Sequence, residues 1–388
     1  MSDIVPAVVV GGQVNGLGVV RSLAVGGVRT ITVDTTLTRP AMWSRFSQRA
    51  LVGKLSGRPL VDSLLALQQR IGSRPVMILT DEVAVSTVSQ HRDELAAAYR
   101  FQLPSAAMVE ALEDKACFRD FARQHALPVP ETVVLSQDTD LAQLAGLQYP
   151  VIVKPADKRS VHSGRTRRIE LVANAAEARA VGREMLGTAG QIVVQEWIEG
   201  PDSEIYFSLF YRAKSTATTR IFHGRKVISH PPRVGSTALC VAAPEVADVL
   251  GPITERFVAA ADYDGFGSLE FKRSATTGRF LIIEPTVART DWQEEIATLS
   301  GVNLPLIAYR HALGLPTLDA TASHRAVAWR ETFLRGHGGS GALAGVRTYD
   351  GYWRSDDPGP AVVFYAHLAA RNVAQRFERQ LGRLRLLA

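Results

Sequence analysis

The sequence has only two cysteines in 388 residues, Cys117 and Cys240, and they lack the spacing of a metal-binding motif. So few cysteines make a reducing cytoplasm the expected setting. The chain also lacks an apolar run of about 18 residues, which argues against a membrane span. Its first apolar stretch, VPAVVVGG, is too short for a signal peptide and has no basic flank, so it is interpreted as a buried strand.

Internal repeats and low-complexity segments are absent as well, and 46% of the residues are hydrophobic. A chain of this length has room for two or three domains with ample cores. The net charge of +6 raises the question of nucleic acid. Part of the excess lies between Lys154 and Arg168, where no aromatic residue is interleaved with the arginines. A site for single-stranded nucleic acid typically uses such aromatic residues to stack on the bases, so we do not expect a nucleic-acid site here.

The first hundred residues alternate between strand and helix patterns. Residues 5–34 predict a strand, a glycine turn, a helix and a strand, residues 74–82 a further strand, and residues 83–100 a helix. This alternation favours a parallel sheet with a binding crevice at the strand ends. The turn does not complete a GxGxxG motif, because Arg21 stands where the third glycine would be. Dinucleotide binding is therefore disfavoured, although the amides of this loop can hold a carboxylate or phosphate.

A β-hairpin is predicted over residues 265–289, where GFGSLEFKR and RFLIIEP are joined by the turn residues SATTG. Folded back, the hairpin brings Glu270 beside Glu284. Two carboxylates that close imply a divalent cation or a shared proton. Cations flank the pair at Lys272, Arg273 and Arg289, which suits a site where metal and polyphosphate meet. The alternative is a surface hairpin whose acids make ordinary salt bridges.

Other polar residues precede this hairpin in a definite order. They are Lys115 in EDK, Lys154 in VIVKP, the strand end Gln195-Glu196-Trp197-Ile198, and Glu204 in GPDSE. Together with Glu270, Glu284 and Arg289 the series resembles the ATP-grasp superfamily of carboxylate–amine ligases, from the first βαβ region to about Leu315. The segment RTDWQEEIATLSGVNLPLIAY, interpreted as two helices broken near residues 301–303, looks most like the D-aspartate ligase and amino-acid ligase kind.

The resemblance implies an α/β (α+β) fold of ATP-grasp type. Its expected parts are a Rossmann-like α/β domain at residues 1–104, a small ATP-binding subdomain at 105–200, a larger α+β subdomain with the metal hairpin at 201–315, and a helical extension at 316–388. The extension is expected to include a helix over about residues 362–384.

The resemblance also implies roles for individual residues. Lys115 and Lys154 would reach the phosphates of ATP as point charges. Glu196, Trp197 and Ile198 would border the adenine, and Glu204 would accept the ribose hydroxyls. Glu270 and Glu284 would bind Mg²⁺ or Mn²⁺, and Arg289 would act with Lys154 in catalysis. Taken singly, Lys115 is also compatible with a solvated helix lysine, and Trp197 is also compatible with a simple core residue.

Two features depart from the family. The loop over residues 157–168, glycine-rich in the family, here has Gly164 as its single glycine. Side chains would therefore have to contact the phosphates, with Arg165 foremost. The other cationic or polar candidates in this loop are Lys158, Arg159, His162, Ser163 and Arg167. Thr286 stands where the family commonly has a metal-binding Asn, so Thr286 is only a candidate third ligand.

The function implied is an ATP-dependent ligase that activates a carboxylate as an acyl phosphate and couples it to an amine, with release of ADP and phosphate. Expected substrates are small molecules, an amino acid or peptide, with no nucleic acid and no membrane as partners; a homodimer is left open. The alternative is a nucleotide-binding sensor or scaffold of the same fold without turnover.

Overall fold

The structure, a computed structural model, describes residues 5–156, 169–233, 235–316, 326–332, 343 and 345–371. The chain forms two compact units. Unit 1 comprises Met1–Phe101, Ser236–Cys240 and Thr290–Ala388, and unit 2 comprises Gln102–Gly235 and Val241–Arg289. The finer division into four segments stays a prediction.

Unit 1 is built on a parallel sheet with the strand order β3-β2-β1-β4. Its strands are β1 (Ala7–Val10), β2 (Thr30–Asp34), β3 (Ser47–Leu51) and β4 (Val76–Leu79). All four residues of β1, AVVV, are buried, as is typical of a parallel strand covered on both faces. The predicted parallel sheet is confirmed.

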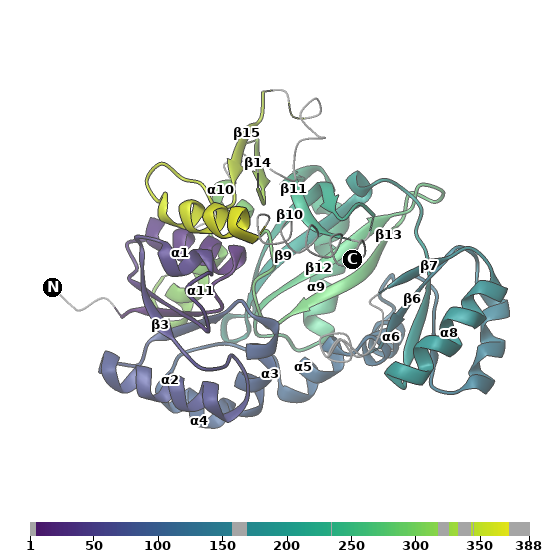
Figure 1. Cartoon of the computed structure of the whole chain (residues 1–388), viewed down its shortest axis with the longest axis horizontal. Helices are drawn as coiled ribbons and strands as arrows, with labels where there is room; N and C mark the ends of the chain where they lie inside the picture. The colour runs from purple at the N-terminus through teal and green to yellow at the C-terminus, as the bar shows by residue number, and fades with distance from the viewer. Residues whose placement is uncertain are drawn as a thin grey trace, which may run out of the picture. The chain divides into compact units, whose positions relative to one another are not determined.

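Helices cover this sheet (Figure 1). They are α1 (Val14–Val25), α2 (Gly57–Ile71), α3 (Glu82–Gln90), α4 (Arg92–Ala98) and α11 (Leu304–Ala312), with the short 3₁₀ helix η1 (Pro40–Trp43). Helix α10 (Glu295–Leu299) packs on α1. The single helix predicted over residues 83–100 is wrong, because α3 ends at Gln90 and α4 begins at Arg92, with His91 as the cap residue between them. Asp93 and Glu94 lie in the first turn of α4, where negative charge stabilises a new helix start. The predicted pair of helices after Asp291 is confirmed as α10 and α11.

Three further strands belong wholly or mostly to unit 1, in the order β11-β14-β15. They are β11 (Ser236–Ala242), β14 (Val327–Arg330) and β15 (Arg347–Asp350). The sequence did not predict β14 and β15. Residues 359–371 are helical, which confirms the start of the predicted terminal helix, and its remainder lies outside the described residues. In the part of the chain that the structure describes, no helix is both long and apolar enough to cross a membrane.

Unit 2 contains an antiparallel sheet with the order β13-β12-β9-β10. Its strands are β9 (Ile205–Ala213), β10 (Thr218–His230), β12 (Gly265–Arg273) and β13 (Phe280–Val287), and helix α9 (Ala247–Ala260) packs on β9 and β10. The strands β12 and β13 are the predicted hairpin, with Glu270 directly opposite Glu284. The hairpin and its register are therefore confirmed.

A second antiparallel sheet of unit 2 has the order β5-β8-β6-β7. It comprises β5 (Thr132–Leu135), β6 (Val151–Pro155), β7 (Glu170–Val172) and β8 (Ile192–Glu196). The helices of this part are α5 (Ala106–Glu113), α6 (Lys115–Gln124) and α8 (Ala175–Ala189), with 3₁₀ helices η2 (Asp138–Gly146), η3 (Asp202–Glu204), η4 (Lys214–Thr216) and η5 (Pro244–Val246) elsewhere in the unit. Helix α8 lies beside β6 and β7 (Figure 1). It closes a core of mainly aliphatic side chains.

Candidate functional site

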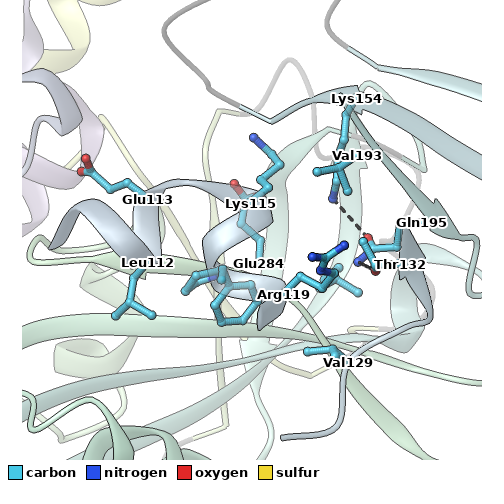
Figure 2. A pocket seen from close by; sticks show the side chains of 13 residues that line it. Leu112, Glu113, Lys115, Arg119, Val129, Thr132, Lys154, Val193, Gln195 and Glu284 are labelled. Atoms are coloured by element: carbon cyan, nitrogen blue, oxygen red, sulfur yellow. Dashed lines mark hydrogen bonds between the residues drawn. The ribbon is translucent and has the colours of Figure 1, made fainter. Parts of the chain in front are cut away.

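A pocket lies within unit 2, where α5, α6 and strands from both sheets of the unit contribute side chains (Figure 2). Its lining residues are Leu112, Glu113, Lys115, Phe118, Arg119, Val129, Thr132, Lys154, Val193, Gln195, Ile283, Glu284 and Pro285. Three residues predicted from the sequence, Lys115, Lys154 and Glu284, are therefore brought to one place. Two lysines and a carboxylate around a partly apolar pocket are groups suited to a polyphosphate and its metal.

The start of α6 places Lys115. Asp114 is the N-cap residue, and its carboxylate accepts hydrogen bonds from the backbone N–H groups of Ala116 and Cys117, both at 2.9 Å. Such a cap fixes where a helix begins. Lys115 is consequently the first residue of α6, and its own N–H donates to the carbonyl of Ala156 at 3.3 Å, just after β6.

A hydrogen-bond chain across the small sheet holds Lys154. Its Nζ donates to Gln195 Oε1 at 3.1 Å, and Gln195 Nε2 donates to Thr132 Oγ1 at 3.1 Å (Figure 2). Thr132 Oγ1 in turn donates to the carbonyl of Pro130 at 2.8 Å. The three side chains come from the neighbouring strands β6, β8 and β5. The ammonium of Lys154 is thus oriented within the pocket by Gln195 and Thr132, neither of which the sequence analysis had assigned a role.

The two acids of the hairpin have different surroundings. Glu270 is partly buried and forms an ion pair with Lys226 of β10, whose side chain is 5% exposed. Glu284 is exposed and lines the pocket, whereas Glu270 does not. A β-bulge between Glu270 and Phe271 interrupts the ladder beside the pair. The ordinary salt bridge weighed as an alternative is therefore present at Glu270, and it is made by a lysine that the sequence analysis did not name.

The structure leaves the other metal and catalytic assignments as predictions. Thr286 pairs with Ser268 across the hairpin, and Arg289 is the last residue of unit 2. Neither lines the pocket. Among the described residues, no group of three or more His, Cys, Asp or Glu side chains could hold a metal ion. That Glu270 and Glu284 hold a cation therefore stays a prediction, and it would leave the other oxygen ligands to phosphate or water.

The strand end predicted to border adenine lies at the end of β8. Glu196 Oε1 accepts a hydrogen bond from the N–H of Gln148 at 3.0 Å, and the N–H of Trp197 donates to the carbonyl of Pro150 at 3.0 Å. The indole Nε1 of Trp197 is buried and has no hydrogen-bond partner within the described ranges. A buried donor of this kind fits a site that receives a polar ligand.

Beyond this strand end lies the predicted ribose acceptor. Glu204 closes η3, and its Oε2 is 3.9 Å from the guanidinium of Arg273. Ile198, Glu204, Glu196 and Trp197 do not line the pocket. The prediction for Arg165 and the rest of the basic loop falls on residues 157–168, which lie outside the described residues.

Comparison with known proteins gives one curated relative and many similar structures. No family model matches the chain. A D-aspartate ligase from Enterococcus faecium is 23% identical over 226 residues, which are 56% of this chain and 53% of the relative. The chain thus matches about half the length of this curated relative.

Three solved structures illustrate the fold. An N5-carboxyaminoimidazole ribonucleotide synthetase in complex with ADP has a TM-score of 0.66 at 13% identity, over 84% of this chain and 81% of the other. Biotin carboxylase from Campylobacter jejuni has a TM-score of 0.65 at 14% identity, over 82% and 73%. An L-amino acid ligase from Bacillus licheniformis has a TM-score of 0.62 at 15% identity, over 83% and 78%. The predicted ATP-grasp fold and the resemblance to carboxylate–amine ligases are confirmed.

Proposed function

We propose that this chain of ATP-grasp fold is an ATP-dependent ligase, which activates a carboxylate as an acyl phosphate and joins it to an amine. The observation that carries the proposal is the pocket in which Lys115, Lys154 and Glu284 converge. The relative's name and the neighbours' ligands support it, since one is a D-aspartate ligase and another was solved with ADP.

The residues present fit ATP with a divalent cation. Lys115 and Lys154 would bind phosphate oxygens, Trp197 would offer its buried N–H to the nucleotide, and Glu204 would accept the ribose hydroxyls. Glu270 and Glu284 would hold Mg²⁺ or Mn²⁺, which neutralises phosphate charge when bound. Phosphoryl transfer asks little covalent chemistry of the protein, so its side chains act by positioning and by charge.

The proposed reaction has two steps. In the first, an oxygen of the substrate carboxylate attacks the γ-phosphorus and the bond to ADP breaks. Lys154, held in place by Gln195, would stabilise the charge that develops on the transferred group, together with Arg289. In the second, the amine attacks the acyl carbon, phosphate leaves with the bonding electrons, and the amine loses a proton. We propose an amino acid or peptide as substrate, on the strength of the two amino-acid ligases among the similar proteins.

A nucleotide-binding protein without turnover is the second candidate. It is favoured by the ion pair of Glu270 with buried Lys226, which already neutralises one of the two proposed metal ligands. Such a protein would gain stability from Mg-ATP by mass action, about 2.7 kcal/mol at a hundredfold excess over the dissociation constant, and would form no ADP.

The test is trapping of the activated carboxylate. The protein is given Mg-ATP and a panel of amino acids and small acids, with hydroxylamine in place of the amine. We expect hydroxamate in step with ADP and phosphate for the right acid, and none when the acid is omitted. AMP and pyrophosphate as products would contradict the mechanism. Stabilisation by Mg-ATP without ADP from any acid in the panel would favour the second candidate.

A further inference from the structure

The chain between β8 and β9 makes a turn at Gly200-Pro201 before η3, and Glu204 stands at the end of that turn. We propose that Lys272 of β12 is a positioning residue that holds this turn and thereby places Glu204 for the ribose hydroxyls of ATP. The inference rests on the proposed function and adds to it a determinant of nucleotide specificity.

Lys272 contacts the turn directly. Its Nζ donates hydrogen bonds to the carbonyl of Gly200 at 2.9 Å and to the carbonyl of Pro201 at 2.7 Å. The carbonyl of Pro201 also accepts the N–H of Glu204 at 3.0 Å. The carbonyl oxygen of Pro201 thus accepts two hydrogen bonds, one from Nζ of Lys272 and one from the backbone N–H of Glu204. A displacement of Lys272 would therefore be transmitted to Glu204.

Packing around Gly200 joins the same three residues. Gly200 has φ +140°, a conformation that side chains rarely adopt. A Cβ built there would lie 3.5 Å from Cβ of Glu204 and 3.6 Å from Cε of Lys272. The turn therefore lies between the side chain of Glu204 and the methylene stem of Lys272. The shape of the turn and the place of Glu204 depend on each other.

Burial makes these contacts obligatory. Lys272 is 5% exposed, so its ammonium is largely removed from water. A buried ammonium must be hydrogen-bonded, and within the described ranges its two acceptors are carbonyls of this turn. A lysine that served only to neutralise acids would point to a carboxylate rather than to two carbonyl groups.

The strand register links the turn to the proposed metal ligand. Lys272 pairs with Ile205, the residue after Glu204, and Glu270 precedes Lys272 by two positions on the same face of β12. One strand therefore carries both the residue that would bind the cation and the residue that holds the ribose acceptor. This geometry fixes the distance between the ribose side and the phosphate side of the site.

The experiment compares ATP with 2′,3′-dideoxy-ATP, which lacks the ribose hydroxyls from which Glu204 would accept hydrogen bonds. Dissociation constants of both Mg-nucleotides are measured by calorimetry on the wild-type protein and on Lys272→Met, which keeps the stem and removes the donors. We expect the wild type to prefer ATP by roughly tenfold or more, the usual value of a hydrogen bond to a charged group. Lys272→Met should bind the two nucleotides equally, because Glu204 is no longer held in place.

Lys214→Met is the matched control, since Lys214 is an exposed lysine of unit 2 paired with Asp262, and it should keep the wild-type preference. If Lys272→Met does not fold, the same two dissociation constants are measured on Gly200→Ala, which strains the same turn and leaves the lysine in place. If folded Lys272→Met or folded Gly200→Ala retains the preference for ATP, the inference about Lys272 is overturned and the proposed function is not affected. A wild type that binds both nucleotides equally also overturns it but leaves nucleotide binding intact. A wild type that binds neither overturns the proposed function as well.

Discussion

Glu270 and Glu284 face each other across the hairpin, yet their chemical situations differ. Glu270 has a buried cation, Lys226, as partner, whereas Glu284 is exposed at the pocket. Two carboxylates this close repel each other unless positive charge lies near them. Lys226 supplies such a charge beside Glu270. Glu284 is therefore the acid whose charge we expect to matter for ligand binding rather than for folding.

Glu284→Gln tests that assignment. The amide keeps the size of the side chain and removes the charge that a divalent cation needs, so we expect turnover to fall at least ~100-fold. The melting temperature without nucleotide should not change, and binding of Mn²⁺ in the presence of ADP, followed by electron paramagnetic resonance, should weaken. Glu245→Gln, at an exposed position of η5 away from the pocket, is the control. Normal turnover, or loss of the fold, would show that Glu284 is not a metal ligand.

At this scale the sequence predicted the residues that local motifs mark. Lys154 stands out because a lysine before proline ends an apolar strand, and Glu270 and Glu284 because a single hairpin carries both. Lys226 and the contact of Gln195 with Lys154 were missed for a physical reason. Lys226 meets Glu270 only because β9 lies between β10 and β12, and Gln195 meets Lys154 only through strand pairing. Pairing between strands distant in sequence is not visible in a single sequence.

Among the secondary-structure elements, the pair β9–β10 shows how tightly the large sheet of unit 2 is packed. Gly224 of β10 lies directly opposite Phe207 of β9, whose ring is fully buried. A Cβ at position 224 would lie 2.2 Å from Cζ of Phe207. The ring covers the glycine, so there is no room for a side chain at this position.

We expect Gly224→Ala to lower the free energy of unfolding by about 1–3 kcal/mol, because overpacking forces a buried side chain out of its preferred rotamer. Gly251→Ala in α9 is the matched control. The nearest atom to a Cβ there is Nε2 of His223 at 3.9 Å, so the methyl group fits. Alanine in a helix raises the free energy of unfolding by roughly 0.5–1 kcal/mol relative to glycine, so this variant should be stabilised. Urea denaturation measures both variants. Equal effects of the two substitutions would contradict the packing argument.

Elements were predicted best where their signals are local. The hairpin over residues 265–289 has a turn sequence between two β-rich runs, and α10 and α11 are separated by Gly301. The strands β14 and β15 have four residues each and are defined by pairing with each other and with β11. So short a run carries no periodicity of its own. The break at His91 was missed for the opposite reason, since helix-forming residues continue on both sides of it.

Unit 1 as a whole depends on residues from both ends of the chain. Arg21 of α1 donates through Nε to Asp357 at 3.0 Å, and its terminal nitrogens donate to the carbonyls of Gly351 and Tyr352 at 2.9 and 2.8 Å. Arg21 is 7% exposed and Asp357 is 1% exposed. The residue that replaces the third glycine of a dinucleotide motif thus serves to join α1 to the last described segment of the chain.

Asp357→Ala should lower the free energy of unfolding by about 1–3 kcal/mol, because it removes the acceptor of the buried Nε donor of Arg21 and leaves Glu295, 3.7 Å from Nη1, as the carboxylate paired with the guanidinium. Asp62→Ala is the control, since Asp62 pairs with Arg58 where both side chains are more than half exposed, and it should have little effect. Chemical denaturation followed by circular dichroism measures both. Equal stability of the two variants would show that the buried pair does not hold unit 1 together.

The separation of Arg21 from Asp357 also has a consequence for the order of events on the ribosome. Asp357 is synthesised 336 residues after Arg21, a delay of roughly 20 to 70 seconds at 5–20 residues per second. Unit 2 is complete at Arg289, before the last stretch of unit 1 has emerged. The nascent chain therefore already contains every residue of unit 2 while Arg21 of α1 still lacks the carboxylate of Asp357.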